Sequence, residues 1–193
     1  MKALEEKILK EGHLIGSEIL KVDNFLNHQI DTAFCDEMGK EIACLFGDMK
    51  PNKILTVESS GIAIACAASR FLGYIPVVFA KKTKPNTLTG DVYAEDCRSF
   101  TKGTVNTIIV DKRFLKPGDN VLIVDDFLAS GEAGVAMCRL LEQAGCSIAG
   151  FTAAVEKRYQ GGEDRIASMG VSVKCLAIIE KIENGRIIYG TIA

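Results

Sequence analysis

The sequence predicts a single α/β domain built on a mainly parallel sheet with helices on both faces. Short apolar runs rich in Val and Ile alternate with helical patterns along the 193 residues, which is typical of a parallel sheet covered on both sides. The length suits one domain, 1–193, that buries most of its apolar surface. Polar residues or glycines follow several of the apolar runs, at the strand ends where ligands bind in such sheets.

Two helices are expected before the first strand. Residues 2–11 place Leu4, Ile8 and Leu9 on one helical face. Asp31 can cap a second helix, "TAFCDEMGKEIACLF". We expect residues 1–50, together with an irregular C-terminal tail, to form a small hood lobe on the sheet.

The rest of the chain alternates between strands and helices. Helices are expected at 61–73 and 132–145, and each ends at a glycine. Strands are expected at 53–58, 74–80, 105–110, 120–126, 147–156 and 171–179. Four strand ends therefore become candidate sites, at 58–61, from 81 onward, at 125–133 and at 156–157.

Composition limits the function classes. The net charge of −2 gives no global basic field for nucleic acid or an anionic membrane, and no apolar run approaches the ~20 residues of a membrane span. The N-terminal "MKALEEKILKEG" lacks the apolar core of a signal peptide. The seven cysteines are odd in number and contain no CxxC pair, which indicates reduced thiols. We therefore expect a cytoplasmic protein that binds neither membrane nor nucleic acid.

The stretch "VLIVDDFLASGEA", residues 121–133, carries the strongest signal. Ser130 and Gly131 lie where a strand passes into a helix, and small residues there let backbone N–H groups and the helix N-terminus hold a phosphate. Asp125 and Asp126 could accept hydrogen bonds from the vicinal hydroxyls of a ribose carrying that phosphate. The simpler alternative is an acid pair that caps the turn, with Ser130 as an ordinary helix cap.

Two other strand ends carry anion-binding features. "VESSG", 57–61, places two hydroxyls and a glycine before a helix, although a plain strand-to-helix turn would look the same. The segment 81–103 is long, rich in lysine and predicted to lack regular structure, which indicates a flexible catalytic loop over the site. Its alternative is an exposed charged hairpin.

These motifs resemble those of the type I phosphoribosyltransferases. "VLIVDDFLASGEA" is similar to the family's signature for phosphoribosyl diphosphate (PRPP), with Ser130 where Thr is commoner and Phe127 bulkier than the usual aliphatic residue. The resemblance implies that the acids hold the ribose, that residues 129–133 hold the 5′-phosphate, and that the 59–61 turn binds pyrophosphate, often beside a non-proline cis peptide. The positions so implied to bind PRPP are Ser59, Ser60, Gly61, Asp125, Asp126, Ala129, Ser130, Gly131, Glu132 and Ala133.

The resemblance also implies the reaction. A purine nitrogen would displace pyrophosphate from C1 of PRPP, so the site must neutralise the leaving group. Lys81 and Lys82 are the expected diphosphate contacts, and they join Asp125 and Asp126 as the catalytic candidates. Mg²⁺ is the expected cofactor, bound mainly through PRPP and not through a dedicated set of protein ligands.

The fourth strand end bears on the purine. Lys157 in "VEKRYQGG" carries an ammonium, which only donates and so suits the keto oxygen of an oxopurine, although a surface lysine is the commoner reading. The segment "LKVDNFLNHQID" resembles the hood of the bacterial xanthine phosphoribosyltransferases, and that likeness implies purine contacts by Leu20 and Asn27. Phe127 is expected to pack on the purine face. Similar motifs along nearly the whole chain are "ESSGIA", "PVVFA", "TLT", "SFTK" and "SIAG".

Several alternatives stay open. Where the hypoxanthine-guanine branch has an Asp that takes the purine proton, this chain has Ala129, and Glu95 is the only substitute in view. We hypothesise that xanthine, the more acidic purine, enters partly as its anion and needs less help. Guanine, hypoxanthine or a PRPP-sensing RNA-binding role are the other readings, and the family implies a homodimer. His13 and His28 are expected to be structural or surface residues.

Overall fold

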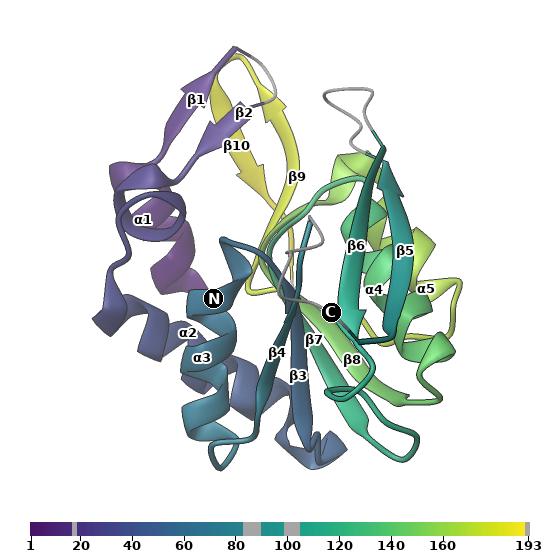
Figure 1. Ribbon diagram of the computed structural model, residues 1–193. Coiled ribbons are helices and arrows are strands. Elements are labelled where there is room, and N and C mark those ends of the chain that lie inside the picture. The colour runs from purple at the N-terminus through teal and green to yellow at the C-terminus, as the bar shows by residue number, and fades with distance from the viewer. Residues whose placement is uncertain (17–18, 83–89, 99–104, 192–193) are drawn as a thin grey trace.

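The structure is a computed structural model that describes residues 1–16, 19–82, 90–98 and 105–191 (Figure 1). Strands β9, β8, β7, β3 and β4 of the central sheet are parallel, and β10 pairs antiparallel at one edge. The predicted, mainly parallel sheet is therefore confirmed. Its spatial order is β10 (Arg186–Tyr189), β9 (Ala177–Glu183), β8 (Ser147–Lys157), β7 (Asn120–Leu128), β3 (Lys53–Val57) and β4 (Val77–Ala80).

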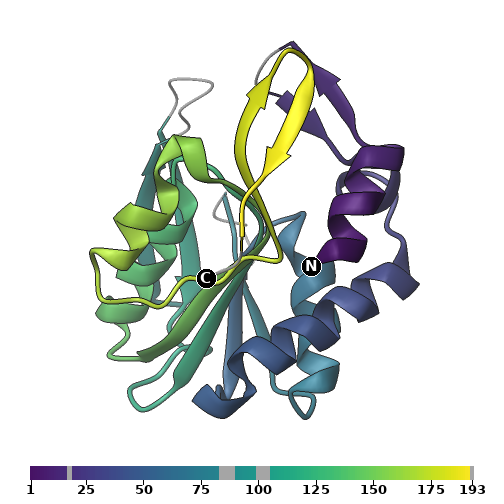
Figure 2. The same ribbon diagram turned by 180° about the vertical axis from the view of Figure 1, so that it is seen from behind.

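Helices cover both faces of this sheet, as predicted (Figures 1 and 2). Ile54 and Leu122 belong to the core shared with α2 (Thr32–Phe46) and α3 (Gly61–Phe71). The next residue along each strand belongs to the core on the other face of the sheet, together with residues of α4 (Glu132–Gln143) and α5 (Gly162–Ala167). Successive strand residues point to opposite faces of the sheet, and helices cover both faces. Residues on both faces must therefore be apolar, which explains the unbroken apolar runs.

The hood is built from both ends of the chain. It contains α1 (Lys2–Glu11), the antiparallel pair β1 (His13–Ile15) and β2 (Ile19–Lys21), the π-helix η1 (Asp23–Asn27) and the β9–β10 hairpin (Figure 1). The Tyr189 hydroxyl donates to the Glu5 carbonyl at 3.2 Å, and the N-terminal amino group donates to the Leu176 carbonyl. The two chain ends are thereby joined.

One expectation about the hood is wrong. The C-terminal tail is the hairpin β9–β10 and not irregular, and its turn residues Asn184 and Gly185 have φ of 52° and 72°. Asn-Gly with both φ positive suits a two-residue hairpin turn. Helix α2 packs on α3, because Gly39 lets it approach the backbone of α3 at Ala67, and it shares one hydrophobic core with the hood residues Leu4 and Leu20. Its predicted cap is confirmed, since the Phe34 N–H donates to Asp31 at 3.1 Å.

The segment 92–98, expected to be loop, forms strand β5 (Val92–Arg98), which pairs antiparallel with β6 (Val105–Asp111). This pair is a separate sheet, so the expectation that 105–110 joins the central sheet is wrong. In β5, Tyr93 and Cys97 pack against the core on the α4 side. The polar residues between them obscured the alternating pattern of a strand in the sequence.

Other element boundaries differ slightly. The expected strand at 171–179 becomes regular only at β9, and before it carries an isolated bridge between Val173 and Phe151. The strand expected from 74 begins at Val77, after Tyr74 with φ of 59° and after Pro76, which has no N–H. Short 3₁₀ turns occur at η2 (Gly47–Met49) and η3 (Arg158–Gln160). Among the described segments, no helix combines the length and apolar character of a membrane span.

Candidate active site

A cavity of about 340 Å³ lies at the carboxyl ends of β3 and β7. It brings together most of the side chains that the sequence singled out, from three of the four strand ends. The predicted residues among its lining are Ser59, Ser60, Lys82, Asp125, Asp126, Phe127, Ala129, Ser130, Gly131, Glu132 and Ala133.

The loop from Ala129 to Gly131 leads directly into α4. Gly131 has φ of 80°, and its carbonyl accepts from the Val135 N–H at 2.8 Å to start the helix. The first N–H groups of a helix have no intrahelical acceptor and point out of its N-terminus. Here that end of α4 opens into the cavity, which makes it an anion site by geometry and by dipole.

The acid pair lies near the end of β7, which continues to Leu128, beyond the expected end at 126. The Asp126 N–H donates to Asp125 Oδ1 at 2.9 Å, and the Phe127 N–H donates to Asp126 Oδ1 at 2.9 Å. Burial raises the pKa of Asp125, and the neighbouring Asp126 carboxylate raises it further. At the cavity wall, each of the two carboxyl groups therefore accepts one backbone N–H through its Oδ1.

The serine turn faces these acids across the cavity. The structure has a cis peptide between Glu58 and Ser59, the feature that the resemblance implied. Gly61 does not line the cavity but holds the turn against the acids. A Cβ there would lie 2.2 Å from the buried Thr56 Oγ1 and 3.2 Å from Asp125 Oδ1, so only glycine fits this approach.

The two lysines after β4 go to different places. Lys82 lines the cavity, and its N–H donates to Glu58 Oε1 at 2.7 Å. Lys81 is bonded through its backbone to Ile109, and its ammonium lies 5.7 Å from the Phe79 ring centroid, at a separate apolar pocket. The geometry therefore favours Lys82 over Lys81 as a diphosphate contact.

The expected catalytic loop is described only in part. Residues 83–89 and 99–104 lie outside the described residues, and the part between them includes β5. Glu95, the suggested proton acceptor, accepts from the Gln143 amide at 2.5 Å and does not line the cavity.

The expected purine contacts lie partly at the cavity and partly in the hood. Phe127 lines the cavity, and the Lys157 ammonium lies 5.7 Å from its ring centroid. Leu20 is instead buried in the hood beside Gly12, and Asn27 is exposed at the end of η1. Neither of these two lines the cavity.

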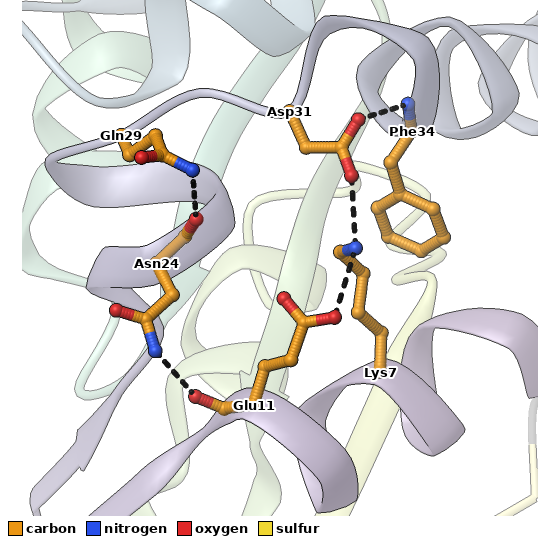
Figure 3. Close-up of polar contacts among 6 residues, drawn as sticks. All are labelled: Lys7, Glu11, Asn24, Gln29, Asp31 and Phe34. Carbon is orange, nitrogen blue, oxygen red and sulfur yellow. Dashed lines mark hydrogen bonds and ion pairs between the residues drawn. The ribbon is translucent and has the colours of Figure 1, made fainter.

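A polar network fixes the hood segment that carries Asn27 (Figure 3). The Lys7 ammonium donates to Asp31 at 2.9 Å and to Glu11 at 3.3 Å, and the bond to Asp31 raises the pKa of Lys7. Asn24 donates to the Glu11 carbonyl at 3.2 Å, and Gln29 donates to the Asn24 carbonyl at 3.2 Å. The π-helix η1 is therefore anchored to α1 and to the start of α2.

The sequence reading missed an ionic cluster behind β8. Arg158 contacts Glu156 at 3.3 Å, Glu163 at 3.2 Å and Glu180 at 2.7 Å. Burial, together with the neighbouring Glu163, raises the pKa of Glu156 to about 7, and Arg158 opposes this rise only in part. The double glycine in "QGGED" was the only sequence signal for this region, because it starts α5, where Gly162 packs against the loop at Ala129 and Gly131.

The pKa of Glu156 predicts a pH-dependent stability. Because it is raised from 4.5 to about 7 in the folded protein, the folded state binds more protons between those values, and the free energy of unfolding from this group falls as pH rises through that window. Glu156→Gln removes the buried charge and keeps a polar partner for Glu163. We expect the variant to gain stability relative to the wild type at pH 8 but not at pH 4.5, as measured by urea unfolding.

The matched control for this measurement is Glu183→Gln. Glu183 is 55% exposed and pairs with Lys181, so the change should shift the unfolding midpoint little at either pH. A parallel pH profile for Glu156→Gln and the wild type would contradict the raised pKa.

The chain is similar to known proteins in sequence and in fold. Residues 21–183 match the model of the phosphoribosyl transferase domain. The chain is 47% identical to the xanthine phosphoribosyltransferase of Ruminiclostridium cellulolyticum, covering 98% of this chain and 99% of that protein. It is 49% identical to xanthine phosphoribosyltransferase 1 of Clostridium perfringens, covering 98% and 100%. The crystal structure of adenine phosphoribosyltransferase from Thermoanaerobacter pseudethanolicus superposes with a TM-score of 0.75 at 22% identity, covering 91% of this chain and 98% of that one.

Proposed function

Because the chain belongs to the phosphoribosyl transferase family, we propose that it transfers the 5-phosphoribosyl group from PRPP to xanthine, giving XMP and pyrophosphate in purine salvage. The observation that carries the PRPP half is the acid pair and the N-terminus of α4 in one cavity. The xanthine half is supported by the names of relatives that are 46–49% identical over nearly the whole chain.

The proposed reaction uses the residues as follows. The 129–133 loop binds the 5′-phosphate, and Asp125 and Asp126 accept hydrogen bonds from the ribose hydroxyls, which fixes C1 in the cavity. The turn at Ser59 and Ser60 and the ammonium of Lys82 stabilise the departing pyrophosphate, whose negative charge grows as the C1–O bond breaks. A purine nitrogen bonds to C1 as the C1–O bond breaks, and the proton of that nitrogen passes to the released pyrophosphate or to water.

Mg²⁺ would supply charge neutralisation of the diphosphate when it is bound. Among the described residues no group of three or more His, Cys, Asp or Glu side chains converges on one point. Asp125 and Asp126 are among the oxygen-bearing side chains that line the cavity, and hard oxygen ligands suit Mg²⁺. We propose that the ion is held mainly by PRPP, with these carboxylates nearby.

Lys157 is proposed to donate to a keto oxygen of the purine, with Phe127 stacked on its face. Guanine and hypoxanthine share one such oxygen, so lower activity with them is compatible with this site. Leu20 and Asn27, which lie in the hood, are proposed to complete the purine site when substrate is bound.

A substrate panel tests the proposal. Xanthine, guanine, hypoxanthine, adenine and orotate are each incubated with PRPP and Mg²⁺, and nucleotide formation is followed by chromatography. We expect the highest kcat/KM for xanthine and the lowest values for adenine and orotate. Adenine turnover equal to that of xanthine would contradict the role given to Lys157, and no turnover of any base would contradict the transferase itself.

A homodimer and a cytoplasmic location are also proposed. Exposed aromatic side chains gather near the edge strand β4, where Phe79 is 41% and Phe114 52% exposed around an apolar pocket. A second copy would cover this surface. Sedimentation equilibrium should give twice the 20.9 kDa of the chain. The described chain keeps seven unpaired cysteines, which suits a reducing compartment.

A further inference from the structure

A guanidinium lies directly behind the loop of residues 129–131, the proposed phosphate site and hence named the phosphate loop. Nη1 of Arg165, in α5, donates to the Ser130 carbonyl at 2.7 Å and to Glu132 Oε1 at 2.6 Å. One nitrogen thus joins the middle of the loop to the first residue of α4. No sequence motif indicated this residue, and it does not line the cavity.

The rest of α5 is packed tightly against the same loop. A Cβ on Gly162 would lie 2.3 Å from the Ala129 carbonyl oxygen and 2.8 Å from the Gly131 nitrogen. Gly131 in turn approaches the Gly162 backbone at 3.0 Å from its ideal Cβ position. The loop therefore rests on the start of α5 without any intervening side chain, and a shift of α5 would move the loop.

The contact to Ser130 sets the direction of the loop's peptide groups. A peptide N–H and the carbonyl attached to the same bond point in opposite directions. Holding the Ser130 carbonyl outward, toward Arg165, turns the Gly131 N–H away from α5 and toward the cavity side of the loop. A preorganised donor of this kind needs no reorientation when an anion arrives.

The contact to Glu132 solves an electrostatic conflict. Glu132 is the first residue of α4 and lines the cavity, so its carboxylate lies near the proposed position of a phosphate dianion. The two negative charges would repel each other unless one of them is neutralised. Arg165 is the cation that the structure provides, with its side chain 43% exposed against 25% for Glu132.

We propose that Arg165 is a positioning residue for the 5′-phosphate of PRPP, acting through the Ser130 carbonyl and the Glu132 carboxylate. The inference rests on the proposed function, because it takes the loop as the phosphate site. It assigns Arg165 to PRPP affinity alone and not to the purine or to the chemical step.

The test compares Arg165→Gln with the wild type in direct binding and in turnover. Isothermal titration of PRPP with Mg²⁺, without purine, should show Kd raised about tenfold, in line with loss of a partly exposed charge-assisted bond pair. The KM for PRPP should rise in parallel, while kcat and the KM for xanthine change less than about twofold. The double variant Arg165→Gln/Glu132→Gln should recover part of the lost affinity, because the unpaired carboxylate is then gone.

The control is Arg70→Gln. Arg70 forms an ion pair with Asp36 at comparable exposure, between α3 and α2 and away from the cavity, so its loss should leave both KM values unchanged. Arg165→Lys should restore part of the affinity through its charge. Thermal unfolding shows whether each variant remains folded.

The outcomes separate the two proposals. Equal PRPP affinity in Arg165→Gln and the wild type would overturn the role of Arg165. The role would also be overturned if the double variant bound PRPP no better than Arg165→Gln and the KM for xanthine rose as much as the KM for PRPP. PRPP binding by the wild type without turnover of xanthine would contradict the proposed function and leave the effect on binding measurable.

Discussion

Replacing Asp125 by asparagine is expected to lower kcat/KM for PRPP by a factor of about 10–100 and, at the same time, to stabilise the free protein. The loss of activity is expected because Asp125 is the proposed charged acceptor for a ribose hydroxyl, and hydrogen bonds to charged groups contribute about 1.5–3 kcal/mol each. The gain in stability follows from the environment of the carboxylate, which is 5% exposed and next to Asp126.

The direction of the stability change depends on pH. Burial and then Asp126 raise the pKa of Asp125 in the folded protein, so the folded state binds more protons than the unfolded chain above the ordinary pKa. The free energy of unfolding therefore falls as pH rises from that ordinary value toward neutrality. Asparagine carries no such charge, keeps an acceptor for the Asp126 N–H and adds a donor toward the Asp126 carboxylate. The melting temperature should rise by about 2–4 °C at pH 7 and by less at pH 4.

Asp119→Asn is the matched control, because the sign reverses there. Burial would raise the pKa of Asp119, but the Lys53 ammonium at 2.6 Å and the Lys116 N–H lower it below its ordinary value. The change should destabilise the protein at pH 7 and leave kcat/KM unaltered. Calorimetry and steady-state kinetics on the two variants check both halves. A lower melting temperature for Asp125→Asn would show that its carboxylate is stabilised in the fold and not strained by burial.

The contrast between these two aspartates explains what sequence could predict about the site. Asp125 and Asp126 end an apolar run and precede a small-residue turn, and local order alone brings them beside the N-terminus of α4. Parallel pairing of β3 with β7 then places the serine turn opposite them, as strand-end logic predicts. Residues tied to the chain in this way were predictable from order and period.

Residues that depend on packing between distant segments were not predictable in the same way. Arg165 and Gly162 meet the phosphate loop only because α5 folds back across the end of β7, more than 30 positions along the chain. Lys81 and Lys82 are adjacent in sequence, but the antiparallel bridge to Ile109 sends only Lys82 to the cavity. The polar face of β5 concealed a strand whose apolar face is needed by α4. In each case the deciding contact is long-range, where local propensity carries little information.

Lys157 is the residue on which the choice of purine should depend most. It ends β8, and its ammonium lies 5.7 Å from the centroid of the Phe127 ring, which lines the cavity. An ammonium offers three donors and no acceptor, so it complements a keto oxygen and opposes a 6-amino group. A site built around one donor discriminates strongly, because the wrong ligand leaves a buried polar group unpaired.

Lys157→Gln should therefore change selectivity more than it changes the fold. The amide keeps a donor but loses the charge, so kcat/KM for xanthine should fall about a hundredfold, and more steeply where xanthine is ionised. Its oxygen can accept from the amino group of adenine, so kcat/KM for adenine should stay level or rise. The xanthine-to-adenine ratio should then narrow by about a hundredfold or more, with the KM for PRPP unchanged.

Lys174→Gln is the control that isolates position from chemistry. Lys174 likewise lies over a phenyl ring, 5.6 Å from the Phe46 centroid, but at the C-terminal end of α2, where it donates to the Leu45 carbonyl at 3.4 Å. Both variants lose a comparable cation–ring contact, so both should lose a similar small amount of stability. Only Lys157→Gln should alter the ratio of kcat/KM values. If xanthine and adenine activities fell by the same factor, Lys157 would be supporting the cavity wall through Phe127, and purine choice would have to come from the hood residues around Asn27.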